Sequence, residues 1–245
     1  MLVAAAVCPC PPLLVPEVAA GAASELDGAR AACADALRVL AAAHPGRLVV
    51  VGPAEESEQG PYPAGTRGSF RGFGVETDVR LGTDGGTDPV GRALPVGREL
   101  PVSLAVAAWL LDWARWSEAP VEGFAVAESL TSERCVRTGA DLAGPPDERV
   151  ALLVMGDASA CRSLKAPGYL DQRAASFDAQ VARALGAADV AALKALDADL
   201  AQELKALGRA PWQVLAGAAE PARLTGDLLY DDAPYGVGYL VAAWA

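Results

Sequence analysis

Short apolar runs separated by polar and proline-containing turns mark the regular elements of this chain. Residues 2–7 are too few and too uniformly apolar for an amphipathic helix, so they predict a buried strand of a parallel sheet. Residues 24–43 carry apolar side chains at helical spacing and end at the stop signal His44-Pro45-Gly46. Residues 47–52 predict a second buried strand. Together these elements predict a β-α-β unit with a right-handed crossover.

The remaining sequence continues this alternation after one long interruption. Residues 53–101 are rich in Gly, Pro, Thr and Asp, and predict an excursion over the carboxyl edge of the sheet with a strand or hairpin around 69–81. The elements predicted beyond it are a helix at 102–116, strands at 121–127 and 149–155, helices at 171–185, 190–196, 199–207 and 212–218, and closing strands at 228–230 and 237–241. This order predicts an α/β fold with a mixed, largely parallel central sheet flanked by helices, in one domain over residues 1–245.

The helix predicted over residues 102–116 carries three tryptophans on one face. Trp109, Trp113 and Trp116 are spaced by four and three residues, so they lie side by side on the helix surface. Packing against the protein core is the preferred interpretation, and stacking against a cofactor is the alternative.

Charge and cysteine content limit the function classes. Asp and Glu number 31 against 20 Lys and Arg, and the resulting net charge of −11 argues against a nucleic-acid partner. No apolar run approaches the roughly 20 residues that cross a bilayer, so we expect no membrane association. The first residues lack the basic segment of a signal peptide, and five scattered cysteines make a poor disulfide framework. We therefore expect a cytoplasmic protein.

Three segments follow predicted strands and are the candidates for chemistry. They are Cys8-Pro9-Cys10-Pro11, residues 52–55, and residues 156–159. In open α/β sheets, ligands bind in the crevice outside the carboxyl ends of the strands. We expect these segments to converge on one edge of the sheet.

The order of several motifs carries a family resemblance that spans nearly the whole chain. The motifs are CPCPPLLVPE, VVVGP, GDASACRS, KAPGYLDQRAASFDAQVARALGAADVAAL and DDAPYGVGYLVAAW. In this order they resemble the class III extradiol ring-cleaving dioxygenases, in the catalytic B-subunit-like superfamily that also contains the Memo-like proteins. The match is nearest to uncharacterised actinobacterial members. The resemblance implies that superfamily's fold.

The same resemblance implies an iron site that this chain cannot build in the usual way. Active members hold ferrous iron with two histidines and a carboxylate, and a further histidine handles protons. Cys10, Ala54 and Ala160 stand where the three histidines are expected, and His44 is the single histidine of the chain. His44 is expected at the carboxyl end of a helix, just before Pro45, where its charge favours the helix dipole, and a ligand role is not the preferred interpretation. The resemblance therefore supports an inference about the fold more strongly than an inference about the activity.

Cysteine ligands are the alternative to the missing histidines. Cys10 stands at a ligand position, with Cys8 two residues away and Asp157 at a neighbouring strand end, so a metal site from Cys10 with Cys8 or Asp157 is conceivable. Against this, the Cys-Pro-Cys spacing is not that of a structural zinc site, and buried structural thiols are the preferred interpretation. We expect no cofactor; iron(II) or another divalent metal belongs only to this alternative.

Two arginines are candidates for binding an anionic or aromatic ligand. Arg67 and Arg71 lie among glycines together with Phe70 and Phe73, and could hold a carboxylate or phosphate while a ring covers an aromatic face. A hairpin with solvated arginines is the structural alternative.

Polar residues after the strand at 149–155 and near the carboxyl terminus complete the candidate set. Asp157 and Lys165 would form an acid–base pair if they touch, with Ser159 and Tyr169 beside them. Tyr235, in a turn rich in Gly and Pro, is a further candidate ligand contact.

Three functional hypotheses follow, and they leave open whether the protein is an enzyme. The first is a divergent dioxygenase-like protein without the two-histidine iron site, which binds a small aromatic or anionic ligand or performs altered chemistry in the same crevice, with ring cleavage lost. The second is a metal-dependent oxidoreductase with Cys and carboxylate ligands. The third is a non-catalytic subunit that assembles with itself or with another chain.

Overall fold

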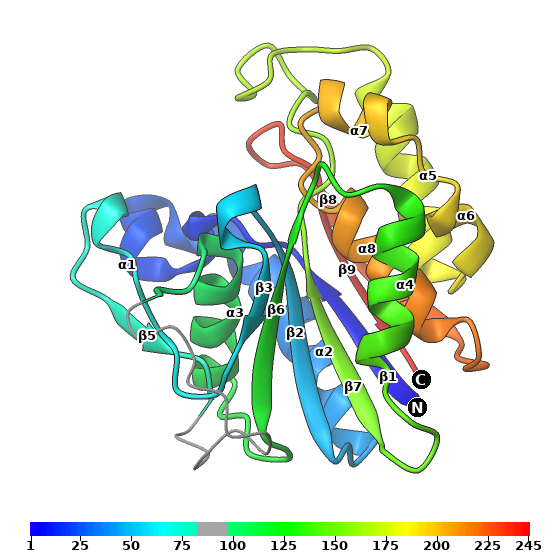
Figure 1. Ribbon diagram of the computed structural model, residues 1–245. Helices are drawn as coiled ribbons and strands as arrows, with labels where there is room; N and C mark the ends of the chain where they lie inside the picture. The colour runs from blue at the N-terminus through cyan, green and yellow to red at the C-terminus, as the bar shows by residue number, and fades with distance from the viewer. Residues whose placement is uncertain (83–97) are drawn as a thin grey trace.

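The centre of the protein is a twisted mixed β-sheet, and the computed structural model describes residues 1–82 and 98–245 (Figure 1). Within these residues the sheet has seven strands in the order β3-β6-β2-β7-β1-β9-β8. The strands are β3 (Gly60–Tyr62), β6 (Val121–Ala127), β2 (Arg47–Ala54), β7 (Val150–Met155), β1 (Leu2–Cys8), β9 (Tyr239–Trp244) and β8 (Gly226–Asp232). Strands β6, β2, β7 and β1 are parallel, and β3, β9 and β8 join them in antiparallel pairs. The predicted α/β class is confirmed.

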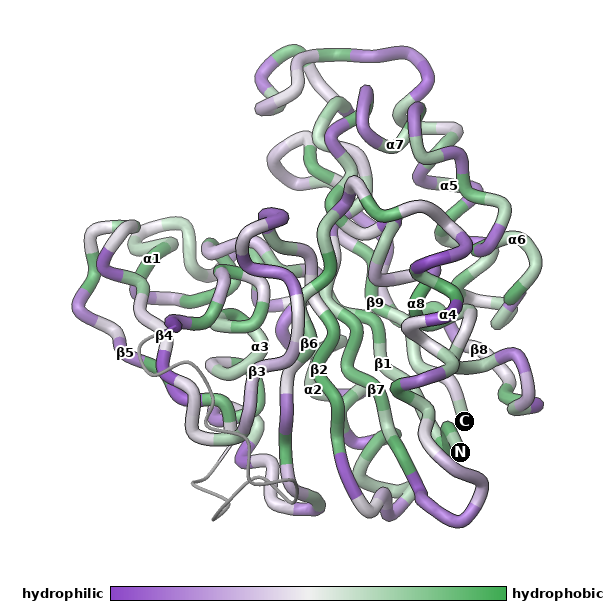
Figure 2. The backbone as a smooth tube through the Cα atoms, in the orientation of Figure 1, coloured by the Kyte–Doolittle hydropathy of each residue, from purple (hydrophilic) through white to green (hydrophobic). Residues whose placement is uncertain are grey.

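Helices cover both faces of this sheet, which explains the uniformly apolar strands. Figure 1 shows α3 (Val102–Trp113) on one side of the sheet and α4 (Ser132–Leu142) on the other. One core cluster joins α2 (Asp27–Ala42) and α3 to the sheet, and a second joins α4, α5 (Ala174–Gly186) and α8 (Arg209–Ala219) to its other face. All residues of β7 and β9 are buried, and the central strands form the most hydrophobic part of the chain (Figure 2).

Short elements fill the connections. They are helices α1 (Pro16–Ala19), α6 (Val190–Lys194) and α7 (Ala198–Glu203), and 3₁₀ turns at Pro12–Leu14, Ala20–Leu26, Glu56–Glu58 and Arg71–Phe73. The predicted hairpin is confirmed, because β4 (Arg67–Ser69) pairs antiparallel with β5 (Asp78–Arg80). Part of the predicted 53–101 excursion, residues 83–97, lies outside the described residues.

The sequence prediction differs from the structure at several helices. The helix predicted at 24–43 begins at Asp27, because a 3₁₀ turn precedes it, and the tryptophan-bearing helix ends at Trp113. Helix α4 was not predicted. Its outer face is charged, and its inner face packs on α8 where Gly139 of α4 and Gly217 of α8 meet the opposite backbone. A Cβ atom on Gly139 would lie 1.9 Å from the Val214 carbonyl oxygen, so the two helix backbones touch.

The tryptophan face of α3 is divided between core and solvent. Trp109 is buried, whereas Trp113 is 46% exposed and stacks on Trp109 with ring centroids 5.8 Å apart. The indole of Trp116 donates to the Ala119 carbonyl. The described helices include none with both the length and the hydropathy that crossing a bilayer requires.

Candidate functional site

A pocket of about 720 Å³ lies at the carboxyl edge of the four parallel strands. Each strand delivers a residue to it just past its end: Cys10 after β1, Glu55 after β2, Glu128 after β6 and Asp157 after β7. The three segments that the sequence places at this edge therefore all reach one pocket. The connections explain why a crevice forms here, because β2 leads on to α3 on one face while β7 leads on to α5 on the other.

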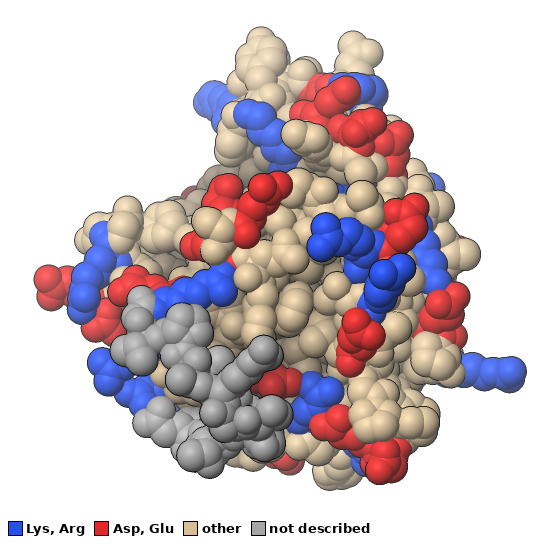
Figure 3. Space-filling model, viewed as in Figure 1, with Lys and Arg blue, Asp and Glu red and all other residues tan. Residues whose placement is uncertain are grey.

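The described lining combines apolar walls with acidic groups. Its apolar side chains come mainly from prolines and from Leu13, Val102, Leu207 and Val237. Its carboxyl groups belong to Glu55, Glu56, Glu58, Glu128 and Asp157. Figure 3 shows acidic side chains gathered on this face above the ends of β2 and β3. Among the described lining residues there is no Lys or Arg.

Asp157 is the most enclosed carboxyl group of the pocket. Its side chain is 8% exposed, and Oδ1 accepts a 2.9 Å hydrogen bond from the backbone N–H of Cys10. Gly156 allows this placement, because a Cβ there would lie 2.5 Å from the Cα of Gly208 at the start of α8. Burial raises the pKa of Asp157 to about 7, against the opposing effect of the Cys10 hydrogen bond. Asp157 thus exchanges a proton near neutral pH.

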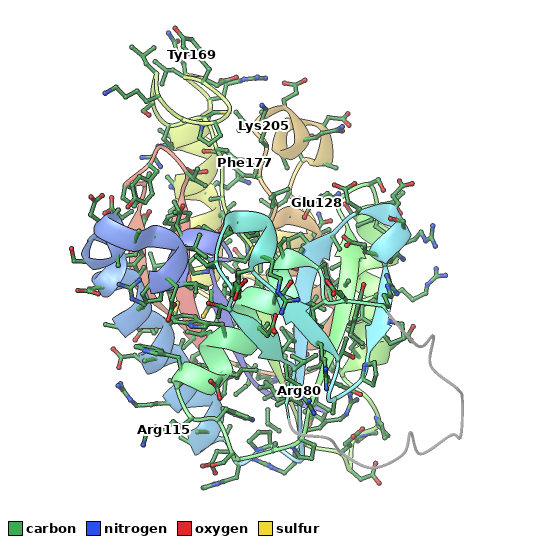
Figure 4. The ribbon with its side chains drawn as sticks, turned by 90° about the vertical axis from the view of Figure 1, so that its left-hand side faces the viewer. Arg80, Arg115, Glu128, Tyr169, Phe177 and Lys205 are labelled. Atoms are coloured by element: carbon green, nitrogen blue, oxygen red, sulfur yellow. The ribbon has the colours of Figure 1, made fainter. Side chains whose placement is uncertain are left out.

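Glu128 is the second carboxyl group with a strongly raised pKa. It accepts hydrogen bonds of 3.2 and 3.3 Å from the Ala210 amide in the first turn of α8, and Arg209 Nε lies 3.5 Å from its Oε2. Burial raises its pKa to about 7, although the Arg209 charge and the Ala210 amide favour the ionised form. Arg209 is itself 2% exposed and is held by the Leu130 carbonyl and Gln213. Figure 4 shows Glu128 at the end of the sheet.

Cys10 lies beside these carboxyl groups as a neutral thiol. It is 6% exposed, and its pKa is raised well above the usual value by burial first and then by Asp157 and Glu128. Cys8 is fully buried and is hydrogen-bonded to Cys33, which with burial raises its pKa. Thiols of this kind are poor nucleophiles, because nucleophilic attack requires the thiolate.

The residues present do not fit the iron centre that the family resemblance implies. No three donor side chains of the His, Cys, Asp or Glu type are grouped as a metal site within the described residues. The one histidine, His44, lies just before β2 begins, whereas the pocket lies where β2 ends. Cys10 contacts Asp157 through its backbone amide, and the thiol of Cys161, another buried cysteine, donates to the Leu204 carbonyl. The Cys10 metal site with Cys8 or Asp157 stays a prediction.

Two tyrosines from the carboxyl-terminal segment complete the lining. Tyr239, the first residue of β9, is 2% exposed, and its hydroxyl makes no hydrogen bond to any described residue. Burial and then Asp157 raise its pKa above the usual value, so the hydroxyl stays protonated. The Tyr235 hydroxyl, in contrast, is covered and meets no group in hydrogen-bonding geometry, and burial and Glu25 raise its pKa.

Other residues predicted from the sequence lie outside this pocket. Arg67 and Arg71 line a second pocket of about 1120 Å³ beside the β4–β5 hairpin, where Arg71 pairs with Asp78 at 2.7 Å. Ser159 is fully buried, and both its amide and its hydroxyl donate to Asp178.

The loop after β7 does not bring Lys165 onto Asp157. Lys165 is exposed and is not part of the described lining, so the structure shows no acid–base pair between these two residues. Tyr169 is 63% exposed on the outermost loop, far above Glu128 in Figure 4. Of the site residues predicted from sequence, the pocket gathers Cys10, Asp157 and Tyr235.

Two lining residues, Glu128 and Tyr239, are not among the site residues that the sequence predicts. Glu128 directly follows the strand at 121–127, so the carboxyl-end rule was a sufficient signal for it. Tyr239 enters the same edge from the amino end of an antiparallel strand, which that rule does not cover.

Comparisons with known proteins support the fold. No protein family profile and no curated protein sequence matches the chain. The crystal structure of the uncharacterized protein JW3007 from Escherichia coli K12 is similar, with a TM-score of 0.57, 13% sequence identity, and 99% of each chain covered. At this identity the likeness concerns the α/β architecture along the whole chain.

Proposed function

We propose that the protein is a divergent relative of the class III extradiol dioxygenases that binds a small organic molecule in the carboxyl-edge pocket, without the two-histidine iron centre. The pocket itself is the observation that supports this proposal. It has a volume suited to a small ligand, apolar walls, and a few polar groups on four neighbouring strand ends. The order of the sequence motifs supports the relationship to the family.

Two features support chemistry as well as binding in this pocket. Glu128 and Asp157 both have pKa values of about 7, so each can give or take a proton at neutral pH. The groups around them, Cys10 and Tyr239, stay protonated and serve as hydrogen-bonding contacts. We propose no step that needs bound iron, because the donor groups for it are not assembled.

A ligand screen combined with metal analysis tests this proposal. Purified protein is screened against small aromatic, amine and carboxylate compounds by thermal shift, and its metal content is measured in parallel. Ser129→Trp places a large side chain on the pocket rim at an exposed position, and Ser117→Trp makes the same change at an exposed position elsewhere.

We expect a stabilising ligand that loses its effect in Ser129→Trp and keeps it in Ser117→Trp. Stoichiometric iron together with catechol cleavage would contradict the proposal. A ligand that stabilises both variants equally would show that it binds outside the pocket.

A further inference from the structure

The described lining of the pocket carries acidic groups without a cationic side chain, and most of these groups already have partners. Glu55 and Glu58 form a reciprocal capping box at a 3₁₀ turn, and Glu56 accepts a 2.5 Å hydrogen bond from Ser129. Glu128 has the Arg209 guanidinium behind it. Because these four carboxyl groups already have partners in the protein, they do not need a positive charge from a ligand.

Asp157 differs from the other acidic groups because no cation within the described residues compensates it. Its one hydrogen bond comes from the Cys10 amide to Oδ1, and the groups that act on it electrostatically, Cys10 and Tyr239, are neutral thiol and hydroxyl groups. By contrast, the buried Asp178 is paired with Arg162 at 2.9 Å and with Ser159. A buried carboxylate normally needs such a partner.

Tyr239 provides an independent observation that a ligand belongs at this place. Tyr239 is 2% exposed and lines the pocket beside Asp157; its hydroxyl has no hydrogen-bond partner among the described residues and stays open to the pocket. A hydroxyl in this position bonds either to water or to a ligand that enters the pocket. A polar group bound between Tyr239 and Asp157 would satisfy both.

We infer that the molecule bound in this pocket is an organic amine, whose ammonium group pairs with Asp157 and Tyr239 and whose apolar body lies against the proline-rich walls. This inference rests on the proposed function, because it assigns the chemical class of the ligand of the same pocket. An ammonium group has three N–H donors, which matches the two acceptors Asp157 Oδ2 and Tyr239 Oη. An anionic ligand would instead meet five carboxyl groups.

Amine binding is coupled to proton release in this site. The charged form of Asp157 is needed to pair with the ammonium group, and burial leaves about half of it protonated at pH 7. Cys10, in the segment after β1, and Tyr239, on β9, face Asp157 and do not titrate near neutrality. Glu128, with Arg209 behind it, is the other group that titrates in this range. Affinity for the amine therefore rises from pH 6 to pH 8.

Three probes of similar shape test the inference by isothermal titration calorimetry. They are 2-phenylethylammonium, 2-phenylethanol and phenylacetate, measured at pH 6, 7 and 8 in buffers of different ionisation enthalpy. Asp157→Asn removes the charge in the pocket, and Asp112→Asn removes the same charge at an exposed position of the second pocket.

We expect the amine to bind more tightly than the alcohol, to release protons, and to lose about tenfold or more of its affinity at pH 8 in Asp157→Asn but not in Asp112→Asn. If the alcohol or phenylacetate binds while the amine does not, and Ser129→Trp abolishes that binding, the amine inference is wrong and the proposed function stands. If no probe binds at millimolar concentration, both are overturned.

Discussion

Replacing Asp157 by Asn should stabilise the folded protein above neutral pH. In the folded protein the pKa of Asp157 is raised from 3.8 to about 7, chiefly by burial. The folded state therefore binds more protons than the unfolded state between these values, and the free energy of unfolding falls as the pH rises through this window. Asn does not titrate, and its Oδ1 can still accept the hydrogen bond from Cys10.

The size of this stabilisation follows from the pH range between the unfolded and folded pKa values of Asp157. This range spans about 3 pH units, and each unit corresponds to roughly 1.4 kcal/mol. Asp157→Asn should raise the free energy of unfolding by about 4 kcal/mol at pH 8 and by about 2 kcal/mol at pH 5. Asp157 is almost fully enclosed, so solvent screening reduces these values little.

Urea denaturation followed by tryptophan fluorescence at pH 5, 6, 7 and 8 measures the difference between wild type and variant. Asp112→Asn is the control, because Asp112 is exposed and its replacement changes the net charge equally. A stabilisation that is the same at pH 5 and pH 8, or a destabilisation at pH 8, would refute the reasoning. Either result would mean that the charge of Asp157 is compensated in the folded protein.

Three further predictions follow from the same structure. Gly139→Ala should destabilise the protein by about 2 kcal/mol or more in urea, because its Cβ would lie 1.9 Å from the Val214 carbonyl oxygen; unchanged stability would mean that α4 and α8 are further apart. Arg209→Met should raise the pKa of Glu128 further above about 7, measured by carboxyl ¹³C NMR with circular dichroism as the folding control; a lower pKa would contradict the role of Arg209. Cys10 should react with a disulfide reagent about a hundredfold more slowly in the folded protein than in urea, because its buried thiol stays protonated; fast labelling would contradict this.

The strands and the edge that they share were predictable from the sequence. Short apolar runs such as residues 150–155 have no helical periodicity, and the carboxyl-end rule then places the residues after them on one side of the molecule. Cys10 and Asp157 therefore appear together in the prediction and in the pocket.

The other residues of the site could not be predicted, because the packing of the folded chain, and not a local sequence pattern, decides which side chains reach the pocket. Lys165 is only eight positions from Asp157, but the loop that carries it is held by hydrogen bonds such as that from the Gly168 amide to the Ala160 carbonyl, and the Lys165 side chain is left exposed. Arg67 and Arg71 belong to a hairpin whose position over α3 no local pattern specifies. Tyr239 reaches the pocket only because β9 runs antiparallel to β1.

The contact between Gly156 and Gly208 has a consequence for recognising distant relatives of this protein. Gly156 precedes the acidic residue at the end of β7, and Gly208 precedes the helix that holds Glu128 in place. A side chain at either position would push the strand end and the helix apart, since a Cβ on Gly208 would also lie 2.2 Å from the Trp212 ring. Glycine at both positions, together with the acidic residues at 128 and 157, is therefore a four-residue signature. We expect this signature to separate sequences that keep the acidic pocket from those that share only the architecture.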